Sequence, residues 1–294
     1  MLSRFISLLL ILVLGLSKSY MLSSNKIYRS LLNRRIVSLE SLSYIRMASF
    51  IKDESIDSSN NDNIIVGNAN EIKQRMSQAA LNAGKDISLV KLVAVSKTKP
   101  SSDIMTLYQA GYRSFGENYF QELLDKAAEL PEDIQWHFIG HLQSGKANKL
   151  VREVKGLHVV ETVDTIKLAK KLDAACEAAN RESLDIYIQV DTSGEDTKSG
   201  VPIPEVVALV MEIVESCKRL KVKGLMTIGA PGDLSCFDRL VESRQEVAEA
   251  MQISSESLVL SMGMSGDYCE AIERGAGSVR VGSSIFGARI YAEK

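Results

Sequence analysis

From about Ala69 onward, the hydrophobic positions along the chain fall into two alternating patterns. Short apolar runs of strand length are separated by longer runs in which apolar residues recur at helical spacing. The pattern predicts a first helix over Glu71–Ala83, ending near Gly84, and then eight strands. The predicted strands are Leu92–Lys97, Ser114–Asn118, Trp136–Gly140, Leu157–Val163, Asp185–Asp191, Val222–Ile228, Leu258–Met264 and Ser278–Ile285.

Helical runs lie between these strands. They are predicted over Ser102–Ala110, Phe120–Leu130, Ala147–Val154, Thr165–Arg181, Pro204–Leu220, Phe237–Met251 and Tyr268–Arg274. Strands that alternate with crossover helices favour a single (β/α)8 barrel of the TIM type, which needs ~250 residues. An open doubly wound sheet is the competing architecture. It would usually carry a Gly-rich turn after its first strand, where this sequence has Lys97–Pro100 instead.

Residues 1–66 do not share this pattern, and we expect them to form a targeting leader and a polar linker before a barrel domain at 67–294. Phe5–Leu16 is an apolar run of signal-peptide length. Ser17–Phe50 is rich in serine and basic residues, which is typical of an organelle transit peptide, such as one for a plastid. Residues 51–66 are polar and are expected to be disordered. The alternative is a start at Met47, which would leave the protein in the cytoplasm.

The composition excludes several classes of function. The formal net charge of -2 gives no overall basic field for nucleic acid. The four cysteines are scattered without zinc-ligand spacing, and they predict reduced thiols packed in or near helices. His137 and His141 are four residues apart at a predicted strand end with no carboxylate between them, so a metal pair is not expected.

Lys97 ends the first predicted strand, and strand alternation places it on the same face as Val93 and Val95. If the two valines fill the barrel interior, Lys97 points into the barrel mouth, where the active sites of such barrels lie. Loss of solvation there would lower the pKa of the lysine and make its amine a nucleophile toward an aldehyde. The alternative is a solvated lysine at a strand terminus.

The last two strands end in turns that are suited to a phosphate group. Ser261–Gly266 ends the seventh strand just before a helix, and Val279–Ser284 ends the eighth. Barrels commonly bind phosphate with the loops after these two strands. Glycines let backbone amides approach an anion, and serine hydroxyls add donors. Two tight turns that need glycine for conformational reasons alone are the alternative explanation.

Several motifs, in this order along the chain, resemble the pyridoxal phosphate homeostasis protein family. They are Val-Ser-Lys-Thr-Lys-Pro, Phe-Gly-Glu-Asn-Tyr, Trp-His-Phe-Ile-Gly-His-Leu-Gln-Ser, Asp-Thr-Ser-Gly-Glu-Asp-Thr-Lys-Ser-Gly, Gly-Leu-Met-Thr-Ile, Leu-Ser-Met-Gly-Met-Ser and Val-Arg-Val-Gly-Ser-Ser-Ile-Phe-Gly-Ala-Arg. The match runs from about Glu71 to the end of the chain. That family is similar to the barrel domain of bacterial alanine racemase.

The resemblance implies a site for pyridoxal 5'-phosphate (PLP). Lys97 would hold the cofactor as a Schiff base, and Arg280 would lie at the pyridine nitrogen. An arginine there would donate a hydrogen bond and keep the nitrogen unprotonated, which weakens the ring as an electron sink. The resemblance also places Ser265, Gly282 and Ser283 near the phosphate. Asn118 and Lys198 would be further neighbours of the cofactor.

Three functions compete for such a site. The first is a PLP-holding protein that contributes to vitamin B6 homeostasis without catalytic turnover and delivers PLP to apo-enzymes. The second is a PLP-dependent racemase, which needs an acid and a base on opposite faces of the substrate carbon. The sequence ends at Lys294, soon after the eighth strand, so we do not expect the second domain that supplies this group in related racemases. The third is a Schiff-base aldolase without a cofactor, which does not explain Arg280.

The first function is the one we expect. It requires PLP as the only cofactor and no metal. We expect no nucleic-acid partner, no stable membrane insertion of the mature protein, and a monomer.

Overall fold

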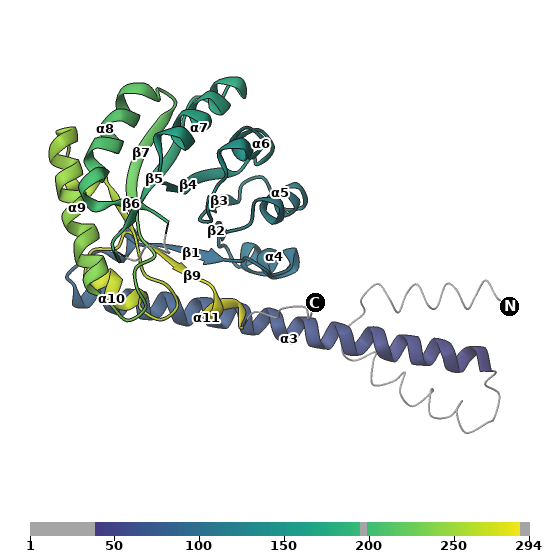
Figure 1. Cartoon of the computed structure of the whole chain (residues 1–294). Coiled ribbons are helices and arrows are strands. Elements are labelled where there is room, and N and C mark those ends of the chain that lie inside the picture. Colours follow the sequence, from purple (N-terminus) through teal and green to yellow (C-terminus); the bar gives the residue numbers. More distant parts are fainter. Residues whose placement is uncertain (1–38, 195–198, 289–294) are drawn as a thin grey trace. The chain divides into compact units, whose positions relative to one another are not determined.

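Eight parallel strands close into a barrel in the computed structural model, which describes residues 39–194 and 199–288, with side chains from residue 61 (Figure 1). Each strand pairs with the next, and β9 pairs back onto β1, so the sheet has no free edge. The barrel strands are β1 (Lys91–Val95), β2 (Ser114–Glu117), β3 (Gln135–Phe138), β4 (Leu157–Val163), β5 (Leu184–Asp191), β7 (Leu220–Met226), β8 (Val259–Ser261) and β9 (Ser278–Val281). The predicted single (β/α)8 barrel is confirmed.

A helix follows each of these strands and covers the outside of the barrel (Figure 1). The seven predicted crossover helices are present close to their predicted bounds. The helices are α4 (Ser101–Gln109), α5 (Phe120–Glu129), α6 (Ala147–Glu153), α7 (Ile166–Ala178), α8 (Val206–Ser216), α9 (Ser235–Met251), α10 (Tyr268–Glu273) and α11 (Ser283–Phe286). Short 3-10 turns precede several elements: η1 (Ile87–Leu89), η2 (Ser144–Lys146), η3 (Ile203–Glu205) and η4 (Ser255–Ser257).

Two strands at the end of the chain are shorter than predicted. β8 ends at Ser261 because the chain turns at Gly263, which has a φ of 90° and where a Cβ would lie 2.6 Å from the Cβ of Ala271. The predicted strand Ser278–Ile285 ends at Val281, because helix α11 begins there: the N–H groups of Ile285 and Phe286 both donate to the carbonyl of Gly282. A two-residue strand, β6 (Val201–Pro202), pairs with β5 and is too short for the sequence pattern to reveal.

The helix before the barrel, α3 (Leu39–Asn82), is longer than the predicted Glu71–Ala83 and includes the expected linker at residues 51–66. Ile65, Ala69, Ile72 and Met76 are buried and recur at helical spacing, so the packed stripe of this helix begins before residue 67. The many Asn, Asp and Ser residues around Ile65 hide this stripe in the sequence. The expected signal core at Phe5–Leu16 lies outside the described residues.

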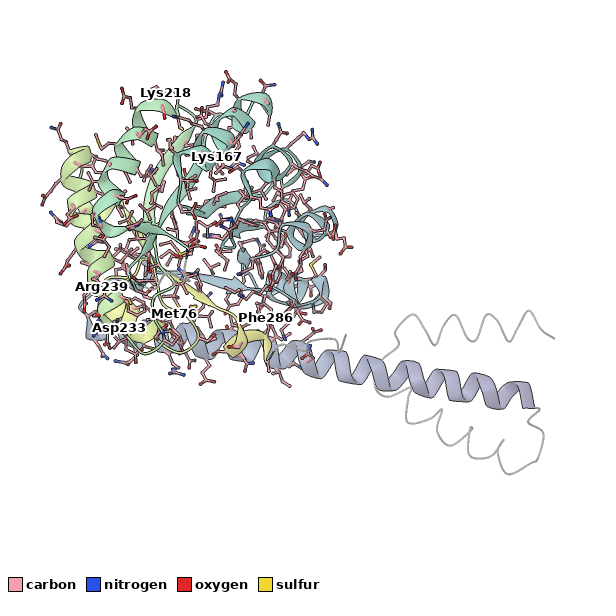
Figure 2. The ribbon with its side chains drawn as sticks, viewed as in Figure 1. Met76, Lys167, Lys218, Asp233, Arg239 and Phe286 are labelled. Carbon is pink, nitrogen blue, oxygen red and sulfur yellow. The ribbon has the colours of Figure 1, made fainter. Side chains whose placement is uncertain are left out.

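Helix α3 is packed against the last elements of the chain. Asn68 Nδ2 donates to the carbonyl of Ile285 at 3.0 Å, and the guanidinium of Arg75 lies over the ring of Tyr268 at 5.5 Å. Figure 2 places Met76 of α3 and Phe286 of α11 along the same edge of the domain. The first and last segments of the domain therefore pack together next to the seam where β9 meets β1.

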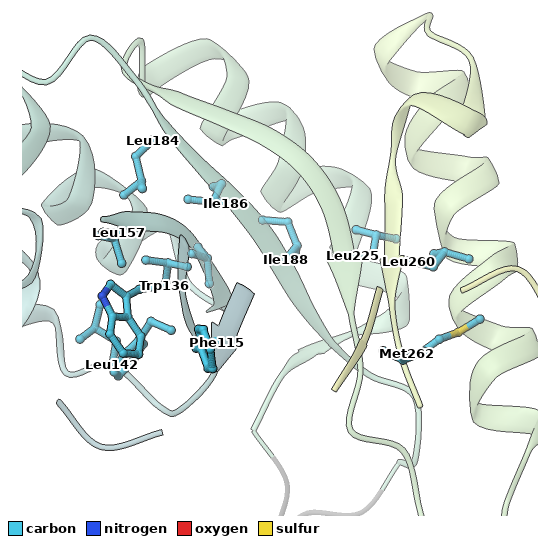
Figure 3. Close-up of a cluster of buried hydrophobic side chains, with 14 of the residues drawn as sticks. Phe115, Trp136, Leu142, Leu157, Leu184, Ile186, Ile188, Leu225, Leu260 and Met262 are labelled. Carbon is cyan, nitrogen blue, oxygen red and sulfur yellow. The ribbon is translucent and has the colours of Figure 1, made fainter. Parts of the chain in front are cut away.

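The hydrophobic core lies between the strands and the surrounding helices (Figure 3). Phe115 of β2 and Trp136 of β3 are paired in register, with ring centroids 6.1 Å apart. Cys176 and Cys217 belong to this core, Cys236 is buried outside it, and all four cysteines are free thiols, as the sequence predicts.

The described residues contain neither a membrane span nor a cluster of metal ligands. None of the helices combines the length and apolar character that a bilayer span requires. No three His, Cys, Asp or Glu side chains in this part of the chain converge as metal ligands would.

The start of the packed stripe gives a test with an adjacent control. Ile65 is 2% exposed and Ile64 is 53% exposed. We expect Ile65→Ala to lower the free energy of unfolding by about 2–5 kcal/mol, because it leaves a cavity under α3, and Ile64→Ala to change it by about 0.5 kcal/mol or less. Urea unfolding followed by circular dichroism measures both. Equal, small losses would mean that the domain does not need residues before 67.

Candidate functional site

A cavity of about 320 Å³, here called the strand-end cavity, opens at the carboxyl ends of the barrel strands. Residues that end or follow β1, β2, β3, β7, β8 and β9 line it. The lining residues are Val95, Lys97, Lys99, Asn118, Ile139, Met226, Ile228, Met264, Ser265, Gly266, Arg280, Gly282, Ser283 and Gly287. Six of the seven predicted site residues are therefore brought together in one place. The seventh, Lys198, lies outside the described residues.

Lys97 is held in a tight turn just after β1, and not in the strand as predicted. The N–H of Ser96 donates to the carbonyl of Gly116 at 3.0 Å, which is the last ladder bond. The chain then turns: the N–H of Lys99 donates to the carbonyl of Ser96 at 3.0 Å, and Thr98 has a left-handed φ of 62°. The predicted face is nevertheless right, because Val95 and Lys97 both line the strand-end cavity.

A buried ionic cluster fixes the residues on either side of Lys97. Lys126 Nζ donates to Glu117 Oε1 at 2.7 Å, to Glu122 Oε1 at 2.6 Å and to the carbonyl of Ser96 at 2.8 Å. The Ser96 hydroxyl donates to Glu117 Oε1, and the Thr98 N–H donates to Glu122 Oε1, both at 2.6 Å. The backbone before and after Lys97 is therefore tied to two carboxylates bridged by one ammonium group.

The carboxyl group of Glu117 is fully buried in this cluster. Burial raises the pKa of Glu117, against the opposing charge and hydrogen bond of Lys126 and the hydrogen bond of Ser96. Because Lys126 is itself buried, the two charges depend on each other for their stability in the fold.

Asn118 follows β2 and lines the cavity, and the segment after β3 has a glycine beside it. A Cβ at Gly140 would lie 1.9 Å from the carbonyl oxygen of Asn118, so only glycine permits this approach. Asn118 Oδ1 is buried and has no hydrogen-bond partner in the described part of the chain. A buried amide oxygen in this state, at the wall of a cavity, is suited to accept a hydrogen bond from a ligand.

Arg280 lies at the floor of the cavity, 4% exposed, and points there from the middle of β9. Its guanidinium donates to the Ser261 hydroxyl and to the carbonyl of Thr227, both at 2.6 Å. These bonds use two of its five N–H donors. Burial lowers the pKa of Arg280, against the opposing charges of Glu161 and Asp267. A guanidinium remains charged at neutral pH even so.

The charge of Arg280 is balanced inside the barrel by Glu161, a fully buried carboxylate on β4. Glu161 Oε2 is 4.0 Å from Arg280 and accepts a hydrogen bond from Ser261 at 2.6 Å, while Oε1 is 2.5 Å from Nδ1 of His137. Burial by itself favours the neutral acid. The His137 hydrogen bond and the neighbouring charges outweigh it and hold the pKa of Glu161 below its ordinary value.

This polar column continues to the other end of the barrel. The rings of His137 and His158 are 5.4 Å apart, and His158 Nε2 is 3.3 Å from Nζ of Lys91. Burial, followed by the positive charge of Lys91, lowers the pKa of His158 to about 4. A line of polar groups therefore runs through the barrel interior. It lies beside apolar side chains such as Val93, which is fully buried and pairs in register with Arg280.

The loops after β8 and β9 meet at the cavity, as the phosphate hypothesis requires. The N–H of Gly282 donates to the Ser265 hydroxyl at 3.3 Å. Ser283 begins α11, and the first amides of a helix have no acceptor within that helix.

Arg239 of α9 joins the loops after β5 and β7. It donates to the carbonyl of Thr192 at 2.6 Å and to Asp233 at 3.0 Å (Figure 2).

Sequence reasoning missed the residues that support the site from behind. His137, Glu161 and Ser261 each stand within an apolar strand run, and that interruption is the signal that could have identified them. Lys126 gives no such signal, because a lysine on an amphipathic helix is normally solvated. Its burial depends on the loop from β1 and on β2 together.

The sequence matches the family described as "Alanine racemase, N-terminal domain" over residues 68–290. Curated relatives are named pyridoxal phosphate homeostasis protein. The one from Homo sapiens is 43% identical over 237 residues, covering 76% of this chain and 86% of the relative. Those from Schizosaccharomyces pombe and Vibrio cholerae are 48% identical over 206 residues and 39% identical over 236 residues. They cover 68% and 76% of this chain, and 84% and 96% of the relatives.

Solved structures agree with this match. PipY from Synechococcus elongatus, solved with PLP bound, superposes with a TM-score of 0.60 at 33% identity, over 74% of this chain and all of that one. A protein described as unknown, from Bifidobacterium adolescentis, gives a TM-score of 0.70 at 30% identity, over 77% and 96% of the two chains. Alanine racemase from Corynebacterium glutamicum, at 17% identity and a TM-score of 0.57 over 78% and 62%, shares the fold.

The cluster behind Lys97 gives the first test at this site. We expect Lys126→Met to lower the free energy of unfolding by about 3–5 kcal/mol, because it leaves the carboxylate of Glu117 buried without its counter-charge. Lys149→Met is the matched control. Lys149 forms an exposed pair with Glu153 at 3.7 Å, and its loss should change stability by about 0.5 kcal/mol or less. Similar losses in the two variants, measured by urea unfolding at pH 7, would contradict the role given to Lys126.

The second test uses the pH dependence of stability. The folded-state pKa of His158 is about 4, below its ordinary value of 6.5. The unfolded chain therefore binds a proton first, and stability falls as the pH drops from 6.5 toward 4. The slope is below the one-proton limit of about 1.4 kcal/mol per pH unit, because the titrations of the folded and unfolded states overlap in this range.

We expect urea unfolding of the ligand-free protein to show a smaller loss between pH 7 and pH 5 in His158→Gln than in the original protein. His141→Gln, at an exposed histidine, is the control and should retain the full loss. Identical pH dependence in all three proteins would show that His158 does not cause the loss of stability at low pH.

Proposed function

The chain belongs to the family of pyridoxal phosphate homeostasis proteins, and on that premise we propose that it holds PLP in the strand-end cavity and contributes to PLP homeostasis. The observation that carries the proposal is the joining of a lysine, an arginine and two serine- and glycine-containing loops at a single cavity of about 320 Å³. This volume is at the lower end of the range for small-molecule sites. PipY, which is 33% identical, was solved with PLP bound.

Lys97 is the residue proposed to hold PLP covalently. Its amine would condense with the aldehyde of the cofactor to give a Schiff base, with the release of one water molecule. The turn at Thr98 and the cluster of Lys126, Glu117 and Glu122 would keep the lysine directed toward the cavity. Lys99 also lines the cavity, and its Nζ donates to the carbonyl of Ala288 at 2.9 Å.

Arg280 is proposed to donate a hydrogen bond to the pyridine nitrogen. PLP when bound supplies an aldehyde and an electron-withdrawing ring, and the strength of that ring depends on the partner of its nitrogen. An arginine held by Ser261 and balanced by Glu161 cannot give up its proton to this nitrogen. The protein would therefore bind the cofactor while limiting its power to stabilise a carbanion.

The phosphate is proposed to lie between the loops after β8 and β9. Ser265 and Ser283 would offer hydroxyl groups to the phosphate. Gly282 has no side chain, which lets its backbone pass close to β1. A Cβ at Gly282 would come within 3.1 Å of the carbonyl of Val95. Asn118, with its buried amide oxygen, would accept a hydrogen bond from the bound ligand, and Lys198 is proposed as a further neighbour.

The protein is proposed to act without catalytic turnover, and its relatives are named as homeostasis proteins. Racemisation is the alternative. It needs a second acid or base across the substrate carbon from the lysine. Of the described residues that line the cavity, the ionisable ones are Lys97, Lys99 and Arg280, and no tyrosine is present among them. We further propose that the protein is a monomer and that apo-enzymes receive PLP from it.

The test combines trapping with an activity assay. The protein purified with PLP should absorb at about 420 nm, and borohydride reduction should attach the cofactor irreversibly to Lys97. Lys97→Ala should lose this absorbance, whereas Lys99→Ala should keep it. Peptide mass spectrometry that finds the cofactor mainly on Lys99 or Lys198 would refute the assignment. In the same preparation, racemisation of alanine or serine at about 10 per second would refute the carrier function and support the racemase alternative.

A further inference from the structure

A second cavity, of about 630 Å³, lies at the opposite end of the barrel, where the strands begin. We call it the strand-start cavity. Its walls come from the chain after α3, the beginnings of β1, β8 and β9, and one face of α9. The lining residues are Gly84, Lys85, Asp86, Leu89, Val90, Arg244, Glu256, Leu258, Val259, Leu260, Arg274, Gly275, Ala276 and Gly277. A cavity of this volume is within the range of small-molecule sites.

Three cations from three different segments face this cavity. Lys85 follows α3, Arg244 is on α9 and Arg274 ends α10. Lys85 Nζ donates to the carbonyl of Ile272 at 3.2 Å, which ties it to the last turn of α10. A Cβ at Gly275 would lie 3.4 Å from that Nζ, so the glycine leaves room for the ammonium group.

Arg244 is the least satisfied of the three cations. Its side chain is 14% exposed, and its Nε is buried with no hydrogen-bond partner among the described residues. Its ion pair is with Glu256, at 3.8 Å, and that carboxylate is 81% exposed. A buried N–H of a guanidinium without an acceptor is unfavourable, and a bound oxyanion would remove the deficit.

Three carboxylates lie at or near the cavity and partly offset its positive charge: Asp86, Asp238 and Glu256. Asp86 accepts the N–H of Ser88 at 2.8 Å, which uses the carboxylate as a cap for the following turn. Arg274 is 3.3 Å from Asp238, on the outer side of α9. Burial and then the charge of Arg244 lower the pKa of Lys85, against the opposing charge of Glu256. Two cations that repel each other across a cavity create a place for a negative charge.

We propose that the strand-start cavity binds a small phosphorylated metabolite through Lys85, Arg244 and Arg274. A phosphate monoester has about two negative charges and three acceptor oxygens, which matches two guanidinium forks and one ammonium group. A carboxylate has two oxygens and a single charge, and it would leave part of this donor set unused. The apolar wall at Leu89, Val90 and Leu258 fits the organic part of the ligand.

This site is distinct from the proposed PLP site. Strands β1, β8 and β9 separate the two cavities: Gly277 precedes β9 at one end, and Gly282 follows it at the other. The two sites can therefore be tested independently, and failure of one leaves the other intact.

The experiment titrates PLP-loaded protein with inorganic phosphate, so that the strand-end cavity is already filled. Calorimetry should detect saturable binding with a Kd of about 1 mM or tighter. Arg244→Gln and Lys85→Gln should each weaken this binding at least tenfold. Arg152→Gln and Lys223→Gln are the matched controls at exposed positions, and each should leave the Kd within twofold.

The PLP content and the circular dichroism of each variant show whether it is folded. If Arg244→Gln does not fold, Lys85→Gln decides the test, because Lys85 lies at the surface end of the cavity. Three outcomes would overturn the proposal: no saturable binding of phosphate, an unchanged Kd in the folded variants, or acetate binding as tightly as phosphate.

Discussion

The pairing of Arg280 with Glu161 is the interaction on which the site depends. A closed parallel barrel has an interior with little water, and a lone guanidinium there would lose much of its solvation. Glu161 supplies the opposite charge, Ser261 bridges the two groups, and His137 satisfies the other carboxylate oxygen. Because these residues come from β9, β4, β8 and β3, the charge on the cavity floor fixes the relative placement of strands on opposite sides of the barrel.

The same logic operates behind Lys97. The lysine itself is on a loop, and loops are the more mobile parts of most proteins. Here the loop is tied down by charges on the neighbouring elements: Lys126 holds the carbonyl of Ser96, and Glu122 holds the N–H of Thr98. The left-handed backbone at Thr98 is kept by these bonds. For the Schiff base proposed at Lys97, a restrained turn reduces the conformational entropy that is lost when the amine meets the aldehyde.

The sequence predicted most of the fold and the residues of the site, and it failed where contacts link distant segments. Alternation in β1 put Val95 and Lys97 on the correct face, and the loops of Ser265 and Gly282 were correctly expected at the barrel mouth, because barrels place such loops in a constant position. The start of the packed part of α3 at Ile65 could not be predicted, since its apolar stripe is interrupted by Asn and Asp. Lys126 was also missed, because only the folded loop of β1 shows that its ammonium group is buried.

The seam between β1 and β9 has a consequence for how the protein is made. Asn68 and Ile285, which are 217 positions apart, form a hydrogen bond beside that seam, and Lys97 and Arg280 face one cavity across it. During synthesis, the ribosome must release the last strand before the first one gains its second neighbour. A chain with such distant pairings acquires its native contacts late and exposes unpaired edges until then. The strand-end cavity is therefore complete only once β9 is in place, so a truncated translation product that ends before β9 lacks the site proposed for the cofactor.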